Sequence, residues 1–311
     1  MTSLLTNNAA MTALQTLTQT NKSLEQTQNR IATGQRVASA QDNAAYWSIA
    51  TTMRSDRSAL STVQDALGLG SGVVDTAYTA VDSASKVVDK IKEKLVAARQ
   101  PGVDRGKVQA EIGQLQSQLQ SMAEAASFSG ENWLSVDSGG TSYNGTKTIV
   151  ASFTRSGGSV SIGTISIDTA SIKLYDADAT ATGIVDGSRD ATGAVSASGT
   201  FSVATLDISA LTDSAADLTT LEEYIVGVDT AFGEMTSAAA DLGAVKSRID
   251  IQKDFVKNLM NAIDRGVGQL VDADMNEEST RLQALQVQAQ LGVQALSIAN
   301  QSSQNIMSLF R

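Results

Sequence analysis

The stretch "LSTVQDALGLGSGVVDTAYTAVDSASKVVDKIKEKL", residues 60–95, decides the fold of this chain. Small or apolar residues recur in it at alternating three- and four-residue steps: Leu60, Val63, Leu67, Gly70, Val74, Ala77, Val81, Ala84, Val88, Ile91 and Leu95. An unbroken heptad seam of this kind predicts a long helix packed against other helices. The glycines of "ALGLGSG" lack the Gly-Lys-Ser/Thr of a phosphate loop, so we expect them to allow close helix packing.

Two further seams accompany the first. One runs from Val108 to Ala126 and the other from Leu221 to Leu270, with Lys246 and Lys253 on the latter. The turn "RQPGVDRG" separates the first two seams, so those helices are expected to fold back as an antiparallel pair, with Asp104 capping the second helix. The third helix is long enough to lie along both.

Both ends of the chain carry heptad seams of their own. They pass through Ala10, Leu14, Leu17, Leu24 and Ile31 at the start, and Leu282, Leu285, Ala289, Gly292, Leu296, Ala299, Ile306 and Phe310 at the close. Each is displaced by about one residue from the neighbouring internal seam, which marks the point where one bundle stops and another begins. We therefore expect a domain boundary with both termini on the same side.

The middle of the chain differs from the arms. From about residue 137 to 211 it is rich in Gly, Ser, Thr, Asp and Ala, with β-type runs "TKTIVASF", "SVSIGTISID" and "TFSVATLDI" divided by "RSGG" and "DATG". Asn144-Gly145 is a hairpin-turn signal. The predicted fold class is therefore mainly α: a hairpin-like antiparallel helical bundle or coiled coil with paired terminal helices and a small central β-rich insert.

Composition narrows the function. The chain has no His and no Cys, so it lacks the commonest general base, the commonest metal ligand and the thiol nucleophile. Aspartate pairs or a Ser–Lys dyad remain formally open, but we expect a structural protein, no enzyme, with no cofactor and no metal. A net charge of −10 disfavours nucleic acid as a partner, and no apolar run is long enough for membrane insertion.

Acidic residues cluster where the last helix is expected to start. Asp272, Asp274, Glu277 and Glu278 could coordinate a divalent cation, but carboxylates at a helix N-terminus also complement its dipole. We favour the capping interpretation.

The terminal segments carry few charges. Segment 2–31 holds only Lys22, Glu25 and Arg30, and segment 279–311 only Arg281 and Arg311. Uncharged polar faces suit helices that are surrounded by other helices, because a buried charge without a partner costs far more than a hydrogen-bonded amide. Since the chain offers no further helices, the neighbours are expected to be other copies of itself.

Two stretches at opposite ends resemble a known family. "NRIATGQRVASAQDNAAYWSIATTMRSD", residues 29–56, resembles the N-terminal signature of bacterial flagellins, and "DADMNEESTRLQALQVQAQLGVQALSIANQSSQNIMSLFR", residues 272–311, resembles their C-terminal signature. The pattern is similar to the flagellins of alphaproteobacteria. Tyr46 and Trp47 stand where many members have Gly and Leu, and we expect both at a subunit contact.

The resemblance implies a secreted subunit of the extracellular flagellar filament, exported by a type III apparatus, that serves swimming motility. It implies an inner-tube domain of residues 1–33 and 272–311, a rod-like shell domain of 34–136 and 212–271 with a spoke at 34–59, and an outer variable insert at 137–211. Implied partners are further copies in a homo-polymer, related co-assembling flagellins, an export chaperone, and hook-junction and cap proteins. The expected assembly residues are Leu14, Leu17, Leu24, Ile31, Tyr46, Trp47, Leu285, Leu296, Ala299, Ile306, Leu309 and Phe310.

Other interpretations stay open at this stage. A hook–filament junction protein has related arms, and a secreted helical adhesin or binding protein would also use long helices. The heptads alone would fit a monomeric bundle, although the uncharged terminal faces count against it. Polymerisation into long filaments distinguishes a filament subunit from these alternatives.

Overall fold

The computed structural model describes the backbone of residues 7–141, 143–178, 182–196 and 199–308, with side chains up to residue 301. The long helices are α1 (Asn8–Thr33), α2 (Ala44–Ala98), α3 (Arg105–Ala125), α4 (Ala215–Val271) and α5 (Met275–Ser308). Short strands and one 3₁₀ turn lie between α3 and α4. The predicted fold class, mainly helical with paired terminal helices and a small strand-containing insert, is confirmed.

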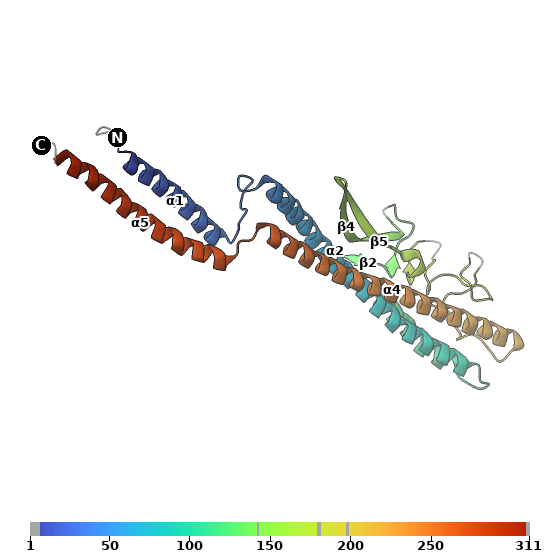
Figure 1. Ribbon diagram of the computed structural model, residues 1–311. Helices are drawn as coiled ribbons and strands as arrows, with labels where there is room; N and C mark the ends of the chain where they lie inside the picture. The colour runs from blue at the N-terminus through green and yellow to red at the C-terminus, as the bar shows by residue number, and fades with distance from the viewer. Residues whose placement is uncertain (1–6, 142, 179–181, 197–198, 309–311) are drawn as a thin grey trace. The chain divides into compact units, whose positions relative to one another are not determined.

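The chain divides into two compact units. One consists of residues 1–58 and 260–311, and the other of residues 59–259. In the first unit α1 and α5 lie side by side over their length (Figure 1). They run antiparallel, because Asn7 at the start of α1 bonds to Ala299 near the end of α5, whereas Arg30 bonds to Glu278.

Antiparallel helices also form the second unit. The ion pairs Asp75–Lys246 and Lys92–Asp229 join α2 to α4, and Arg99, the residue after α2, pairs with Glu222 of α4. From one pair to the next, the residue number of the first partner rises by as much as that of the second falls. The two helices therefore keep a single register without a slip. Every member of the 60–95 seam is buried between them and their neighbours, as its period predicts.

The turn between α2 and α3 follows the predicted pattern. Asp104 accepts a hydrogen bond from the backbone N–H of Lys107 and caps α3. Arg105 beside it is buried, and its guanidinium donates to the carbonyls of Ala98 and Leu211 and to the carboxylate of Asp213. One side chain thereby ties the start of α3 to the end of α2 and to the segment that leads into α4.

The insert is built around one hairpin. Strands β4 (Thr146–Ser156) and β5 (Ser159–Asp168) pair antiparallel, with a bulge between Val150 and Ser152. Gly157 and Gly158 make the turn with φ of 59° and 86°, the left-handed values that a two-residue hairpin loop requires. The Asn-Gly signal was therefore wrong as a hairpin turn, because Asn144 and Gly145 precede β4 and lead into it.

Smaller strands complete the insert. Strands β1 (Ser127–Phe128) and β2 (Glu131–Asn132) pair antiparallel, and β3 (Ser135–Val136) pairs parallel with β6 (Tyr175–Asp176). A 3₁₀ turn, η1 (Thr169–Ser171), follows β5.

The third predicted β run, "TFSVATLDI" at 200–208, is not a strand. Of its residues, Phe201 makes an isolated bridge with Arg189, residues 203–205 form a turn, and the others have no regular secondary structure. Side chains of α3 form hydrogen bonds with the backbone of this run. Gln109 donates to the carbonyl of Leu206 and accepts from the N–H of Ile208. Gln116 donates to the carbonyls of Val203 and Leu206. Its apolar side chains are nevertheless buried, so the run fills the core without joining a sheet.

Candidate assembly surface

Helices α1 and α5 meet along an inner seam of small and medium side chains. Leu17, Leu24 and Ile31 of α1 are partly buried there, as are Leu285 and Leu296 of α5. A β-carbon on Gly292 of α5 would lie 3.2 Å from Leu17 Cδ1, so the absence of a side chain lets the two helices approach closely. The pair covers only one face of each helix.

Polar contacts fasten the pair at both ends. The amide Nδ2 of Asn7 donates to the carbonyl of Ala299 at 3.0 Å, while its Oδ1 accepts from the N–H of Ala10 and caps α1. At the other end, Arg30 and Arg281 donate to Oε1 of Glu278 at 3.0 and 3.2 Å. The Glu278 side chain is only 6% exposed, and two cations compensate its burial.

The break between α4 and α5 is locked to the end of α1. Gly34 ends α1 with φ of 69°, and its carbonyl accepts from the N–H of Ala273. The Asp274 side chain accepts from the N–H groups of Asn276 and Glu277, so it caps α5 as predicted. A small apolar cluster of Val37, Ala50, Val267 and Val271, with Met53, Ile263 and Leu270 against it, fills the adjoining loop.

The expected assembly residues fall into three groups. Leu17, Leu24, Ile31, Leu285, Leu296 and Ala299 are half-buried in the α1–α5 seam. Leu14, Tyr46 and Trp47 are exposed, by 54%, 41% and 38%. The side chain of Ile306, and Leu309 and Phe310 altogether, lie outside the described residues.

A second apolar stripe on α5 is absent from the expected set. Val287, Leu291 and Ile298 are exposed by 54%, 57% and 67%, although each is a large aliphatic residue. They follow one another at four- and seven-residue steps, so they share one helix face, which is not the face that meets α1. The spacing is present in the sequence, but the neighbouring seam through Leu285 and Leu296 is longer and more continuous.

The first unit offers an apolar surface. No group of three or more acidic residues in the part of the chain that the structure describes is arranged to hold a metal ion. None of the described helices combines the length and hydropathy needed to cross a membrane. What the unit presents is a two-helix pair with an uncovered aliphatic stripe.

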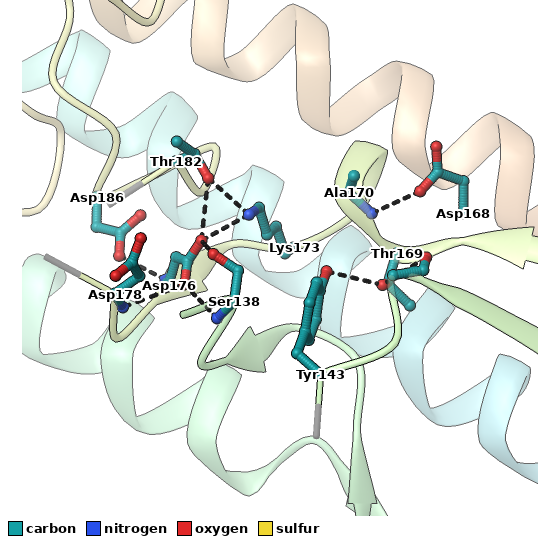
Figure 2. A network of polar contacts seen from close by, with 11 residues as sticks. Ser138, Tyr143, Asp168, Thr169, Ala170, Lys173, Asp176, Asp178, Thr182 and Asp186 are labelled. Atoms are coloured by element: carbon teal, nitrogen blue, oxygen red, sulfur yellow. Dashed lines mark hydrogen bonds and ion pairs between the residues drawn. The ribbon is translucent and has the colours of Figure 1, made fainter. Parts of the chain in front are cut away.

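The insert contains the densest polar cluster of the described residues (Figure 2). The buried ammonium of Lys173 contacts Asp176 Oδ2 and Thr182 Oγ1, both at 2.6 Å, and Ser138 donates twice to Asp176. Burial opposes ionisation of Asp176, but the bonds from Lys173 and Ser138 outweigh it and hold its pKa well below the usual range. Lys173 fills the position a cation would take, so the cluster is a structural ion pair.

Asp186 borders this cluster. Its Oδ2 accepts from the N–H of Asp176 at 2.6 Å, while its Oδ1 is buried without a hydrogen bond. Burial, and to a lesser degree the charge of Asp176, raise the pKa of Asp186. Burial likewise raises the pKa of Tyr175. These groups hold the insert together.

Comparison with known families gives two matches. The family described as "Bacterial flagellin N-terminal helical region" matches residues 4–138, and the one described as "Bacterial flagellin C-terminal helical region" matches residues 225–310. The unmatched residues between them, 139–224, include the β4–β5 hairpin. The matched parts contain all five long helices except the first turns of α4.

Individual relatives match over the whole chain. The chain is 53% identical to Flagellin C of Rhizobium meliloti (strain 1021), over 328 positions that span all of both chains. It is 48% identical to a flagellin of Brucella melitensis over 317 positions and 46% identical to Flagellin A of Rhizobium meliloti (strain 1021) over 398, again with both chains fully covered.

Proposed function

Because this chain belongs to the bacterial flagellin family, we propose that its two uncovered faces on α1 and α5 are the surface through which subunits assemble. The protein is a structural subunit of the extracellular flagellar filament and not an enzyme. Its relatives include several flagellins of one bacterium, which supports a homo-polymer and co-assembly with related chains. The proposal concerns where and how the contacts form.

The exposed stripe of α5 carries this proposal. Burying an aliphatic side chain completely stabilises an assembly by about 1.5–3 kcal/mol. Val287, Leu291 and Ile298 have more than half of their area left to bury, so the three together supply roughly 3–5 kcal/mol for each subunit added. Burial of this stripe would bury few charges with it, because the described side chains of α5 beyond Arg281 are all uncharged.

Assembly also orders the terminal helices in this proposal. An isolated pair of helices covers one seam and leaves its outer faces in water, so it gains little beyond its own hydrogen bonds. Neighbouring subunits supply the missing surface, and ordering then accompanies polymerisation. Contacts of this heterologous type do not close, and they propagate a helical array.

The twelve expected assembly residues and the three-part division remain part of the proposal. Residues 1–33 and 272–311 form the inner tube, residues 34–136 and 212–271 the shell with its spoke at 34–59, and residues 137–211 the outer insert. Tyr46 and Trp47 fit a subunit contact because both aromatic rings are exposed beside the apolar cluster around Val37. An export chaperone, hook-junction proteins and a cap protein are the further partners proposed.

Deleting residues 294–311 tests the proposal. The truncated chain keeps the whole of the 59–259 unit and should remain a soluble, folded monomer by size-exclusion chromatography and circular dichroism. Under salting-out conditions that polymerise the full chain, it should form no filaments in electron micrographs. Normal filaments from the truncated chain would refute the terminal assembly surface, and short stubs from the full chain would instead favour a junction protein.

A further inference from the structure

The β4–β5 hairpin has an apolar patch that its own unit leaves uncovered. Near its base, Ile149, Ile165 and Ile167 point to one face and are buried. The bulge at Ala151 then shifts β4 by one residue, so that Phe153 pairs with Ile162 on the opposite face. The far half of the hairpin therefore turns its apolar side chains away from the core.

Exposure of this patch is large. Val160 is 51% and Ile162 is 60% exposed, and the partly exposed Phe153 pairs with Ile162 on the same face. The other face of the same half carries only Ser, Thr and Gly side chains: Ser152, Thr154, Ser156, Ser159, Ser161 and Gly163. We call Phe153, Val160 and Ile162 the tip patch. A two-stranded hairpin is marginally stable alone, so an uncovered apolar face at its end indicates a partner.

Charge narrows the choice of partner. Between Thr146 and Ile167 the charged residues are Lys147, which pairs with Glu131 near the base of the hairpin, and Arg155 near its tip. Both are cationic, whereas the whole chain has a net charge of −10. Arg155 lies 6.0 Å from the centre of the Phe153 ring, so a cation borders the tip patch. Copies of this acidic chain repel one another, whereas the cationic hairpin is complementary in charge to the acidic remainder of the next copy.

The same unit has a groove with apolar lining and a carboxylate, which could receive the apolar, cationic tip patch. A cavity of about 640 Å³ lies between α4 and the insert, with Ile184, Val195 and Ala238 as apolar lining. Asp241 adds a carboxylate, the carboxylate of Glu234 is already paired with the buried Arg189, and no Lys or Arg is among the lining residues of the groove. Ala170 and Ser171, just after β5, also line it, so the groove is at the base of the hairpin and the patch is at its tip.

We propose that the tip patch of one subunit docks into this α4 groove of a second copy. The inference rests on the proposed filament function, because it requires copies held side by side. One patch and one groove per chain make a heterologous contact, which can repeat along a filament without closing. Strand β5 has ten residues, and at about 3.3 Å for each residue the tip of the hairpin lies roughly 30 Å from its base. The tip can therefore contact the groove of a neighbouring subunit.

Absence of cysteine makes the test direct, because an introduced thiol is unique in the chain. Ile162→Cys places it in the tip patch, and Ser161→Cys places it on the opposite face of the same strand as the matched control. Both thiols should react equally with a maleimide in monomers. In filaments the Ile162→Cys thiol should react about tenfold more slowly, the protection expected if about 1.4 kcal/mol holds it buried, while the control stays reactive.

A second pair of variants locates the groove. Ser237 of α4 also lines the groove. Ile162→Cys combined with Ser237→Cys should therefore give covalent multimers with a bis-maleimide in filaments, and Ser161→Cys with Ser237→Cys should give few. Equal labelling of Ile162→Cys and Ser161→Cys in filaments would overturn the proposal, as would protection already present in monomers. Protection without cross-links to Ser237→Cys would overturn the groove as the docking site. Failure of every variant and of the parent chain to polymerise would instead refute the filament function.

Discussion

Leu291→Ser is the sharpest probe of the α5 stripe. The Leu291 side chain is 57% exposed, so a neighbouring subunit has rather more than half of it to bury. That remainder is worth about 1.3 kcal/mol, taken as the same fraction of the full burial of a leucine. Serine loses this gain and adds the cost of burying a hydroxyl, about 1 kcal/mol or more where no partner is supplied.

These terms predict a change in polymerisation and none in the monomer. A loss of about 1.4 kcal/mol is tenfold in an equilibrium constant, so the critical monomer concentration should rise between about tenfold and a hundredfold. The free energy of unfolding of the monomer should change by less than about 0.5 kcal/mol, because the residue is exposed there. Sedimentation of filaments at a series of protein concentrations measures the first quantity, and urea unfolding the second.

Leu285→Ser is the matched control on the other face of α5. Leu285 is part of the seam with α1, so this substitution should weaken the α1–α5 pair in the monomer as well, seen as faster hydrogen exchange in both helices. A critical concentration for Leu291→Ser within twofold of the parent would mean that the stripe faces solvent in the filament. The exposed stripe of α5 would then take no part in assembly.

Four further substitutions test the second unit. Gly70→Ala should lower the free energy of unfolding, measured by thermal unfolding, by about 1–3 kcal/mol, because its β-carbon would lie 2.5 Å from a methyl of Ile149. A β-carbon at Gly68 meets nothing within 4 Å, so Gly68→Ala should stabilise α2 by about 0.5–1 kcal/mol. Arg189→Met removes a fully buried guanidinium that bonds to two carbonyls and to a carboxylate on α4, so hydrogen exchange across 183–201 should rise sharply while α2 stays protected. Burial raises the pKa of Asp186 in the folded protein. The stability that Asp186 contributes is therefore present at low pH and is lost as the pH rises through the raised pKa. Asp186→Asn should abolish this loss, and an unchanged slope of the unfolding free energy against pH between pH 4 and 8 would refute this role of Asp186.

Much of the helical fold could be predicted from the period of the apolar residues. Every position of the 60–95 seam is buried, and Asp104 and Asp274 cap the helices that they were expected to cap. A heptad repeat and a cap are local properties: each depends on residues within one or two turns of the same helix. Such signals do not require knowledge of what lies across the core.

Predictions that required knowledge of distant neighbours fared less well. The run at 200–208 alternates like a strand, yet Gln109 and Gln116, about 90 residues earlier, bind its backbone. Nothing local distinguishes a backbone group that will meet another strand from one that will meet a glutamine. The burial of Arg189 and the ion pair of Lys173 with Asp176 have no local signal in the sequence for the same reason.

The sequence by itself determined the helical class, the pairing of the two ends and the family, because the apolar period and the terminal signatures are properties of the linear sequence. Only the tertiary structure decided which apolar residues remain uncovered. Leu291 and Ile162 are as apolar as Leu285 and Ile165, and the first two are exposed while the second two are partly or fully buried. Exposure is a property of what packs against a residue, and for a filament subunit it is the exposed apolar surface that remains for the next copy to cover.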